Sequence, residues 1–285
     1  MEGSFCKFGD TFIYVTDQRQ KAIADYLIGK KRTVDRADKV KWENVKRVIM
    51  PTPVSKLDVR PFEKDLLKTN LVKYKPLVYG GAFDDGRKSW LNENEIKFYD
   101  TAVDDMVVEK NAIITAEAVL GLVAVESDYS IKESKIMVTG FGYCGKAIVE
   151  RLLRLEAKVT VVARKKEARI AAIKAGCSAC PFSYGPEEAY ASNVLINTVP
   201  SLVVTEKIIK ELPKDALIID IASGPGGCDK SAIEKNGIKF NHALGLPGRY
   251  MTKSSGKILA DCINRHDPFK ASSGEDDSWI YQIVP

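Results

Sequence analysis

The sequence predicts an α/β protein in which a doubly wound parallel sheet follows a smaller α/β domain. Residues 135–145 join an apolar strand to a glycine-rich turn and then to the start of an amphipathic helix. Such a unit commonly opens a doubly wound sheet. From residue 136 onward, short apolar runs alternate with helical patterns, which is typical of parallel strands connected by covering helices.

The elements of this sheet follow one another along the second half of the chain. After the first strand and the glycine turn, the alternation continues as far as residue 243. The further strands are predicted at 158–163, 179–182, 193–197, 216–221 and 238–243, and the helices at 166–175, 205–212 and 230–236.

The first part of the chain has a sparser pattern. Strands are predicted at 11–15, 45–50, 76–79 and 96–99, with a helix at 20–28. An apolar helix at 115–125 is interpreted as crossing between the two domains, and a helix at 254–264 is expected to return to the first.

These elements define the predicted domains. The small, substrate-side α/β domain is residues 1–114, completed by the helix 252–266. The nucleotide-binding domain is residues 115–251, including the crossing helix 115–126. Residues 267–285 are expected to form a mobile tail because they are rich in serine and acidic residues.

Composition excludes several classes of protein. The chain has 285 residues, 45% hydrophobic and 28% charged, and a net charge of only +5, so we expect neither disorder nor a nucleic-acid partner. It lacks a long apolar run and a signal peptide, so we expect a cytoplasmic protein without membrane association.

Cys177 and Cys180 have a C-x-x-C spacing, but no second pair follows. We therefore expect structural thiols and no metal site, with a redox or metal role as the alternative.

The glycine turn predicts a Rossmann-type dinucleotide site. Gly140 permits a tight turn, Gly142 allows the backbone to approach a pyrophosphate, and Gly145 allows the helix to pack closely on the strand. The amides at the helix N-terminus are suited to bind the phosphates. The intervening Phe141, Tyr143 and Cys144 are expected to line the same site.

The end of the second strand predicts the cofactor. Enzymes that prefer NAD usually have an acidic residue there, whereas this chain has Ala163-Arg164 followed by two lysines. A guanidinium can clamp a 2′-phosphate, so the cofactor is predicted to be NADP. The alternative is that Arg164 belongs to a solvated helix start.

Loops after the later strands are expected to complete the site, because ligands of open parallel sheets bind beyond the carboxyl ends of the strands. One loop, at residues 197–201, starts with two polar residues and contains a proline. Another, at residues 220–227, follows Asp220 and is rich in glycine. For both loops the alternative is a structural turn. Their predicted cofactor-binding residues are Asn197, Thr198, Val199, Pro200, Ala222 and Ser223.

The substrate is expected to be a small anion. Arg19 lies between the first predicted strand and helix, and Arg249 follows the turn at 245–248, where the chain returns to the first domain. Both guanidinium groups match a carboxylate and are expected to face each other across an interdomain cleft, although a salt bridge is the alternative for either. Thr52 and Ser55, after the second strand of the small domain, are expected beside them.

Several motifs, in this order, resemble those of one family: the A subunit of dipicolinate synthase from endospore-forming bacteria. The likeness runs from about residue 111 to about residue 263, whereas Val15-Thr16 stand where that family has a glycine pair. The motifs are Thr115-x-Glu117, residues 128–131, Gly140-x-Gly142-x-x-Gly145, Ala163-Arg164, residues 196–201, residues 220–223 with 225–227, and residues 245–248; Asp17-x-Arg19-Gln20 fits the family's start.

The resemblance implies a flavodoxin-like small domain beside the Rossmann domain, as in D-2-hydroxyacid dehydrogenases. It implies oxidation of dihydrodipicolinate, formed from 4-hydroxytetrahydrodipicolinate, to dipicolinate in spore formation. It further implies the flavoprotein-like B subunit of dipicolinate synthase as partner, and a homo-oligomer is possible. Aromatisation drives such a reaction, so the enzyme needs to orient the substrate and remove a proton. Glu117, Asp17 or water would serve as proton acceptor.

Two other functions stay open at this point. The chain could be another NADP-dependent dehydrogenase acting on a hydroxy acid, which would require an acid/base histidine such as His242. It could also be a non-catalytic nucleotide-binding subunit whose partner performs the chemistry.

Overall fold

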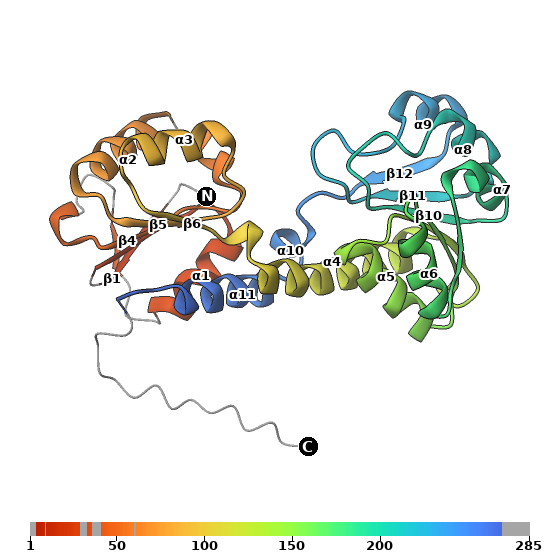
Figure 1. Ribbon diagram of the computed structural model, residues 1–285, viewed down its shortest axis with the longest axis horizontal. Coiled ribbons are helices and arrows are strands. Elements are labelled where there is room, and N and C mark those ends of the chain that lie inside the picture. The colour runs from red at the N-terminus through yellow and green to blue at the C-terminus, as the bar shows by residue number, and fades with distance from the viewer. Residues whose placement is uncertain (1–3, 9, 29–32, 36–40, 60, 270–285) are drawn as a thin grey trace, which may run out of the picture. The chain divides into compact units, whose positions relative to one another are not determined.

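A computed structural model of the chain describes residues 4–8, 10–28, 33–35, 41–59 and 61–269 (Figure 1). The chain divides into two compact units. The N-terminal unit comprises Met1–Thr16, Gln20–Asp104 and Lys257–Pro285, and the second unit comprises Asp17–Arg19 and Asp105–Gly256. None of the helices in the described ranges is both long and apolar enough to cross a lipid bilayer.

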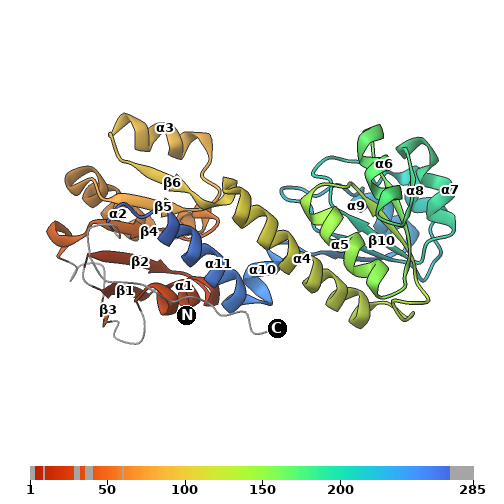
Figure 2. The same ribbon diagram turned by 60° about the horizontal axis from the view of Figure 1, so that its bottom comes forward.

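The N-terminal unit is built on a six-stranded sheet of order β3-β1-β2-β4-β5-β6. β2, β4, β5 and β6 are parallel, whereas β1 pairs antiparallel with both β2 and β3. The helices α2 and α3 cover one face of this sheet, and α1 and α11 the other (Figures 1 and 2). The strands are β1 (Ser4–Phe8), β2 (Thr11–Val15), β3 (Thr33–Asp35), β4 (Arg47–Ile49), β5 (Leu77–Gly80) and β6 (Phe98–Asp100), and the helices are α1 (Gln18–Ile28), α2 (Pro61–Tyr74), α3 (Asp85–Glu93) and α11 (Thr252–Arg265).

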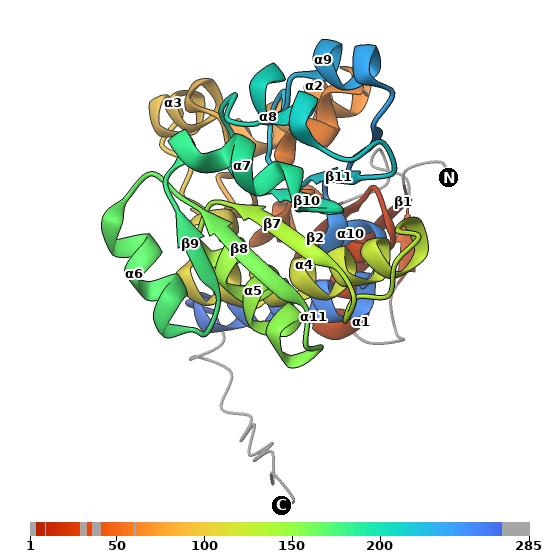
Figure 3. The ribbon, with the colours of Figure 1, turned by 90° about the vertical axis from the view of Figure 1, so that its right-hand side faces the viewer.

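The second unit has an all-parallel sheet of order β12-β11-β10-β7-β8-β9 (Figure 3). Numbered from β7, this is the Rossmann order 3-2-1-4-5-6, so the predicted fold class is confirmed. The strands are β7 (Lys135–Thr139), β8 (Lys158–Val162), β9 (Ser178–Cys180), β10 (Val194–Asn197), β11 (Leu217–Asp220) and β12 (Lys239–His242). The helices are α4 (Asp105–Glu126), α5 (Tyr143–Arg154), α6 (Lys166–Lys174), α7 (Gly185–Tyr190), α8 (Glu206–Glu211), α9 (Lys230–Asn236) and α10 (Leu246–Arg249).

Apolar side chains on both faces of this sheet form the core of the second unit. One cluster joins α4 and α5 to the sheet through residues such as Val119, Ile148 and Val138. The other joins α8 and α9 to the opposite face through residues such as Ile209 and Ile233. Burial on both faces explains why the four central strands, β7, β8, β10 and β11, are mostly apolar, whereas the edge strands β9 and β12 are not.

Several elements differ from those expected from the sequence. β1, β3, α2, α3 and α7 were not predicted, and the turn at 245–248 leads into the short helix α10. α3 is nearly all polar, and only its Leu91 is buried, so it lacks an apolar stripe. α4 begins at Asp105, well before the expected start at Thr115. The division between the two units therefore lies before the expected boundary.

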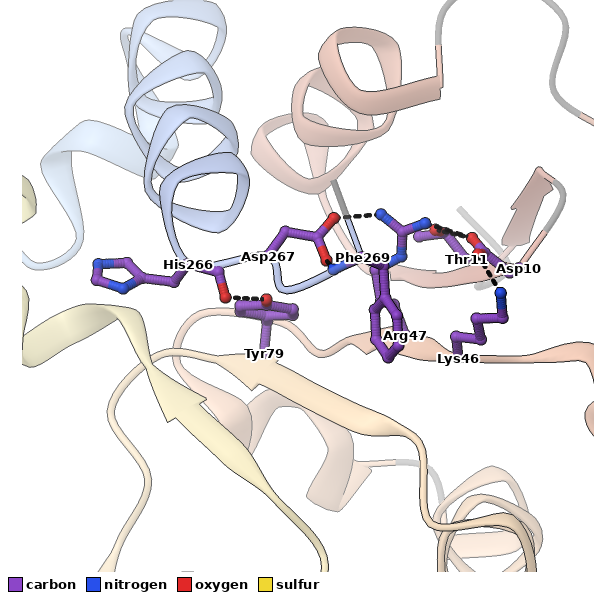
Figure 4. A network of polar contacts seen from close by, with 8 residues as sticks. All are labelled: Asp10, Thr11, Lys46, Arg47, Tyr79, His266, Asp267 and Phe269. Carbon is purple, nitrogen blue, oxygen red and sulfur yellow. Dashed lines mark hydrogen bonds and ion pairs between the residues drawn. The ribbon is translucent and has the colours of Figure 1, made fainter. Parts of the chain in front are cut away.

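The C-terminal end of α11 is held by a polar network (Figure 4). Arg47 on β4 donates to Asp267 and, at 2.5 Å, to Asp10, so that it bridges two carboxylates. The side chain of Asp267 is only 2% exposed. Tyr79 on β5 donates to the carbonyl of His266 at 2.8 Å. Asp267, expected to begin a mobile tail, is therefore a buried anchor; residues 270–285 of that expected tail lie outside the described residues.

Replacing Arg47 by methionine should destabilise the N-terminal unit. The methionine keeps an apolar stem but leaves the buried Asp267 without its cation, which should cost about 2 kcal/mol of unfolding free energy. Lys46→Ala is the control, because Lys46 is 59% exposed and lies 3.8 Å from Asp10. It should change stability by less than about 0.5 kcal/mol. Urea denaturation measures both, and equal effects would show that Arg47 is no anchor.

Candidate nucleotide-binding site

The glycine turn between β7 and α5 has three glycines with different structural requirements. Gly140 has a φ of +90°, and a Cβ there would lie 2.5 Å from Thr198 Oγ1. A Cβ on Gly145 would lie 2.5 Å from the carbonyl oxygen of Gly140. These two glycines are therefore required by the fold itself. A Cβ on Gly142, in contrast, would have no atom within 4 Å, so Gly142 leaves an open space above the helix.

The N-terminus of α5 faces that open space. Gly142 is its N-cap residue and forms no side-chain cap, and the first turn has no acidic residue. Amides at such a helix start attract an anion because they lack intrahelical partners. Tyr143 is half exposed and Cys144 is partly buried, and burial raises the pKa of the Cys144 thiol. The turn therefore has the geometry of a phosphate site.

A buried polar network joins the ends of three neighbouring strands. Thr139, Asn197 and Asp220 are the last residues of β7, β10 and β11, are paired in register, and are all fully buried. Thr139 Oγ1 donates to Asn197 Oδ1 at 2.6 Å, and Asn197 Nδ2 donates to Asp220 Oδ1 at 2.7 Å. The three side chains thus form one chain of hydrogen bonds across the carboxyl edge of the sheet.

The same network shapes the loops that follow. Asp220 accepts hydrogen bonds from the amides of Ala222 (3.0 Å) and Gly227 (2.7 Å), which closes the glycine-rich loop around the carboxylate. Asn197 accepts from the amide of Val199 at 3.1 Å and donates to its carbonyl at 3.1 Å. Both loops are therefore held by the side chains that end their strands.

Thr198 and Ser223 are the polar side chains that these two loops add. Thr198 Oγ1 donates to the carbonyl of Thr139 at 2.8 Å, which ties its loop to the glycine turn. Ser223 is exposed, whereas Ala222 is buried. The predicted residues of the turn and the two loops therefore gather at one edge of the sheet, with Pro200 following Val199 in its loop.

His242 and Cys228 lie beside this network. A Cβ on Gly226 would be 3.1 Å from His242 Nε2 and 2.5 Å from Asp220 Oδ2, so the loop passes directly over both groups. His242 Nε2 lies 3.4 Å from the carbonyl of Ala222. Burial, and then the nearby Asp220 carboxylate, raise the pKa of the Cys228 thiol. His242 is thus at the strand ends, in contact with loop backbone.

Arg164 lies beyond the end of β8 and is exposed. Its carbonyl and that of Ala163 accept hydrogen bonds from Arg169 Nη1, at 2.7 Å and 2.8 Å. Arg169 therefore fixes the backbone at this strand end, while the Arg164 side chain remains exposed to solvent.

The two predicted substrate arginines have different environments within the second unit. Arg19 is only 8% exposed, and a Cβ on Gly248 would lie 3.4 Å from its Cζ. Burial lowers the pKa of Arg19, while the nearby Asp17 opposes that shift. Arg249 is exposed, and its Cζ lies 5.3 Å from the centroid of the Tyr250 ring. Both arginines belong to the same compact unit, although the sequence placed them on opposite domains.

The remaining predicted residues lie on other elements of the two units. Glu117 is exposed on α4, with Oε1 3.7 Å from Nη2 of Arg151 on α5, as in a surface ion pair. Thr52 and Ser55 belong to the N-terminal unit, where Thr52 packs against Gly81 and Ser55 is exposed. Cys177 donates to the carbonyl of Ala172 at 3.0 Å.

Sequence reasoning missed Thr139 as a member of the site. A signal for it exists, since three apolar strands each end in one polar residue: threonine, asparagine and aspartate. Polar residues at the carboxyl ends of adjacent parallel strands meet at one edge, so this repeated pattern predicts a shared network.

Comparisons with known proteins agree with this geometry. The family described as "NADP oxidoreductase coenzyme F420-dependent" matches residues 135–224. The A subunit of dipicolinate synthase from Bacillus subtilis (strain 168) is 33% identical over 162 residues, which cover 57% of this chain and 54% of that protein. In sequence, the chain thus spans about half the length of this curated relative.

Solved structures extend the likeness to most of the chain. The A subunit of dipicolinate synthase from Bacillus halodurans is 26% identical, with a TM-score of 0.78 over 89% of this chain and 95% of that one. The resemblance to this dipicolinate synthase family is confirmed. The corresponding structure from Bacillus subtilis, at 23% identity and a TM-score of 0.75, covers 90% of this chain and 93% of that one and shows the same fold. The family match at residues 135–224 and the curated relative support an oxidoreductase with a nicotinamide nucleotide cofactor.

The buried network predicts a strong effect of Asp220→Asn. The amide places an N–H group among three donors, so at least one hydrogen bond is lost and the unfolding free energy should fall by about 1–3 kcal/mol. Asp215→Asn is the control, because Asp215 is exposed and accepts a hydrogen bond from the Tyr129 hydroxyl at the surface. It should stay within about 0.5 kcal/mol of the native protein in urea denaturation. If Asp220→Asn left the free energy of unfolding unchanged, the network would not stabilise this edge of the sheet.

Proposed function

We propose that the chain binds NADP at the glycine turn and oxidises dihydrodipicolinate, formed from 4-hydroxytetrahydrodipicolinate, to dipicolinate. One observation carries the proposal: the loops that surround the open N-terminus of α5 contain the motifs that resemble the A subunit of dipicolinate synthase, and the matched relative is 33% identical over 57% of the chain. Spore formation and a cytoplasmic location belong to the same proposal.

The chain's own residues fit the proposed cofactor. The open space at Gly142 admits a pyrophosphate, and the uncapped amides of α5 supply donors for it. Arg164 is the exposed cation for the 2′-phosphate. The loops at residues 198–200 and 222–223 would flank the nicotinamide. NADP, when bound, would supply the two-electron acceptor for the reaction.

The substrate is proposed to bind by its two carboxylates. Arg19 offers a partly desolvated guanidinium, which binds a carboxylate more strongly than a solvated one does. Arg249 offers an exposed second guanidinium. Of the two candidate carboxylates, Asp17 is favoured over Glu117, because Asp17 is near Arg19, the proposed substrate guanidinium, whereas Glu117 is paired with Arg151 at the surface.

A partner completes the proposal. The curated relative is named as one subunit of a synthase, so we propose that the flavoprotein-like B subunit of dipicolinate synthase acts with this chain.

The direct test supplies freshly prepared 4-hydroxytetrahydrodipicolinate with NADP and follows NADPH and dipicolinate absorbance, with and without the flavoprotein-like partner. We expect dipicolinate and NADPH in equal amounts. No product without the partner, and product with it, would favour a nucleotide-binding subunit that needs its partner for chemistry. Turnover of 2-hydroxy acids that is abolished by His242→Gln would favour the hydroxy-acid dehydrogenase alternative and contradict the proposal.

Replacing Arg164 by alanine should weaken NADP binding selectively. Loss of a charge-assisted contact to the 2′-phosphate should cost about 1.5–3 kcal/mol for NADP and nothing for NAD. Arg154→Ala is the matched control, since Arg154 is exposed on α5 and pairs with Glu150. Calorimetric titration with both nucleotides decides it, and equal weakening of NADP and NAD would refute the clamp.

Gly142→Val should abolish nucleotide binding while the protein stays folded, because the branched side chain fills the space proposed for the pyrophosphate. Gly121→Val on α4 is the control, since a Cβ at Gly121 also has no atom within 4 Å. The control should bind NADP like the native chain. A folded Gly142→Val protein with native affinity would place the phosphates elsewhere.

Arg19→Ala and Arg249→Ala should each raise the apparent KM or lower turnover at least tenfold, or about 1.4 kcal/mol, without changing the NADP affinity. Arg87→Ala is the control, because Arg87 pairs with Asp58 and Asp84 in the N-terminal unit. Steady-state kinetics test the assignment. If both variants had the kinetics of the native chain, neither arginine would bind the substrate. If Arg19→Ala lowered only the thermal stability, Arg19 would have a role in packing and not in substrate binding.

A further inference from the structure

A second cluster of ligand-type side chains lies within the N-terminal unit. Asp104 directly follows the short helix after β6, and Cys262 and His266 lie four residues apart near the end of α11. That spacing puts both on one face of the chain's helical path. One carboxylate oxygen, the Cys262 Sγ and a ring nitrogen of His266 all lie within 4.8 Å of one another. Among the described residues this is the one group of three with metal-ligand geometry.

Distances inside the cluster are short. Asp104 Oδ2 lies 3.1 Å from His266 Nε2. The Tyr99 hydroxyl lies 2.9 Å from the same oxygen and 2.8 Å from the same nitrogen. Ligands bound to one zinc ion at about 2.0–2.3 Å are roughly 3–4 Å apart, so these oxygen and nitrogen atoms need little movement to share a cation, and the Cys262 Sγ lies within 4.8 Å of the Asp104 and His266 atoms.

The surroundings orient the three side chains. Arg265 Nη2 binds Asp104 Oδ1 at 3.0 Å and leaves Oδ2 toward His266. The backbone carbonyl of His266 accepts a hydrogen bond from the Tyr79 hydroxyl. The imidazole ring of His266 stacks on the Tyr99 ring, with centroids 4.1 Å apart. Cations in proteins commonly have such hydrogen-bonded carboxylates and fixed rings around their ligands.

Burial leaves one side of the cluster accessible. Cys262 is fully buried and Asp104 is 8% exposed, whereas the His266 side chain is 36% exposed. A cation and a water ligand could therefore enter from the His266 side.

We propose that Asp104, Cys262 and His266 bind a divalent cation of the zinc class, with the Tyr99 hydroxyl or water as fourth ligand. A thiol, an imidazole and a single carboxylate form a borderline-soft set that suits zinc better than magnesium or calcium. Binding forms the metal–sulfur bond and releases the Cys262 thiol proton to solvent, with no change of oxidation state. The cation would tie α11 to the point where the chain leaves the N-terminal unit at Asp104.

Cobalt and zinc titrations of the full chain, after removal of metal with EDTA, test the site. We expect one Co²⁺ per chain with a thiolate-to-cobalt charge-transfer band, and displacement by one equivalent of Zn²⁺. Cys262→Ser should abolish the band, and His266→Gln should weaken Co²⁺ binding at least tenfold. Cys177→Ser is the matched control, a buried thiol in the second unit, and should bind like the native chain.

A second readout covers variants that fold poorly. Zinc should raise the melting temperature of the native chain in a concentration-dependent manner, because it binds the folded cluster, and this shift should be lost in His266→Gln. The proposal is overturned if the native chain binds no cobalt, if the spectrum lacks a thiolate band, or if the band persists in Cys262→Ser. Any of these results would show that the cluster binds no metal and that Asp104 is only a hydrogen-bonded carboxylate.

Discussion

The hydrogen bonds among Thr139, Asn197 and Asp220 are the constraint on which the nucleotide-binding edge depends. Their three strands end in register, and the side chains are buried where water cannot satisfy them. Each of these groups, if left without a hydrogen bond, would lower the free energy of unfolding by roughly 1–3 kcal/mol. Because they are hydrogen-bonded to one another, they fix two loops relative to the glycine turn. The edge of the sheet is therefore organised by the protein itself.

The glycine turn separates the requirements of folding from those of ligand binding. Gly140 and Gly145 are needed because a side chain would collide with Thr198 or with the turn's own backbone. Gly142 meets no such obstacle, so packing does not explain its lack of a side chain. A ligand that approaches the start of α5 does explain it, and this is the physical link between the fold and a nucleotide cofactor.

Local sequence signals predicted the Rossmann domain well, because its strands are apolar runs and its turn requires glycine. The N-terminal unit was predicted less completely, since α3 is polar and β1 and β3 pair in an antiparallel arrangement that no short pattern specifies. Contacts between distant residues could not be predicted either. The burial of Arg19 against Gly248, the anchoring of Asp267 by Arg47 and the grouping of Asp104 with Cys262 all depend on the folded topology. The polar ends of β7, β10 and β11 were visible in the sequence, and the strand order and register show which of these side chains are hydrogen-bonded.

The central claim is that a nicotinamide nucleotide with a 2′-phosphate binds across this edge. A crystal structure of the chain with NADP tests it most directly. The account predicts the pyrophosphate against the amides at the start of α5, the 2′-phosphate in contact with Arg164, and the nicotinamide between the loops after Asn197 and Asp220. A nucleotide bound elsewhere, or a 2′-phosphate directed away from Arg164, would contradict it.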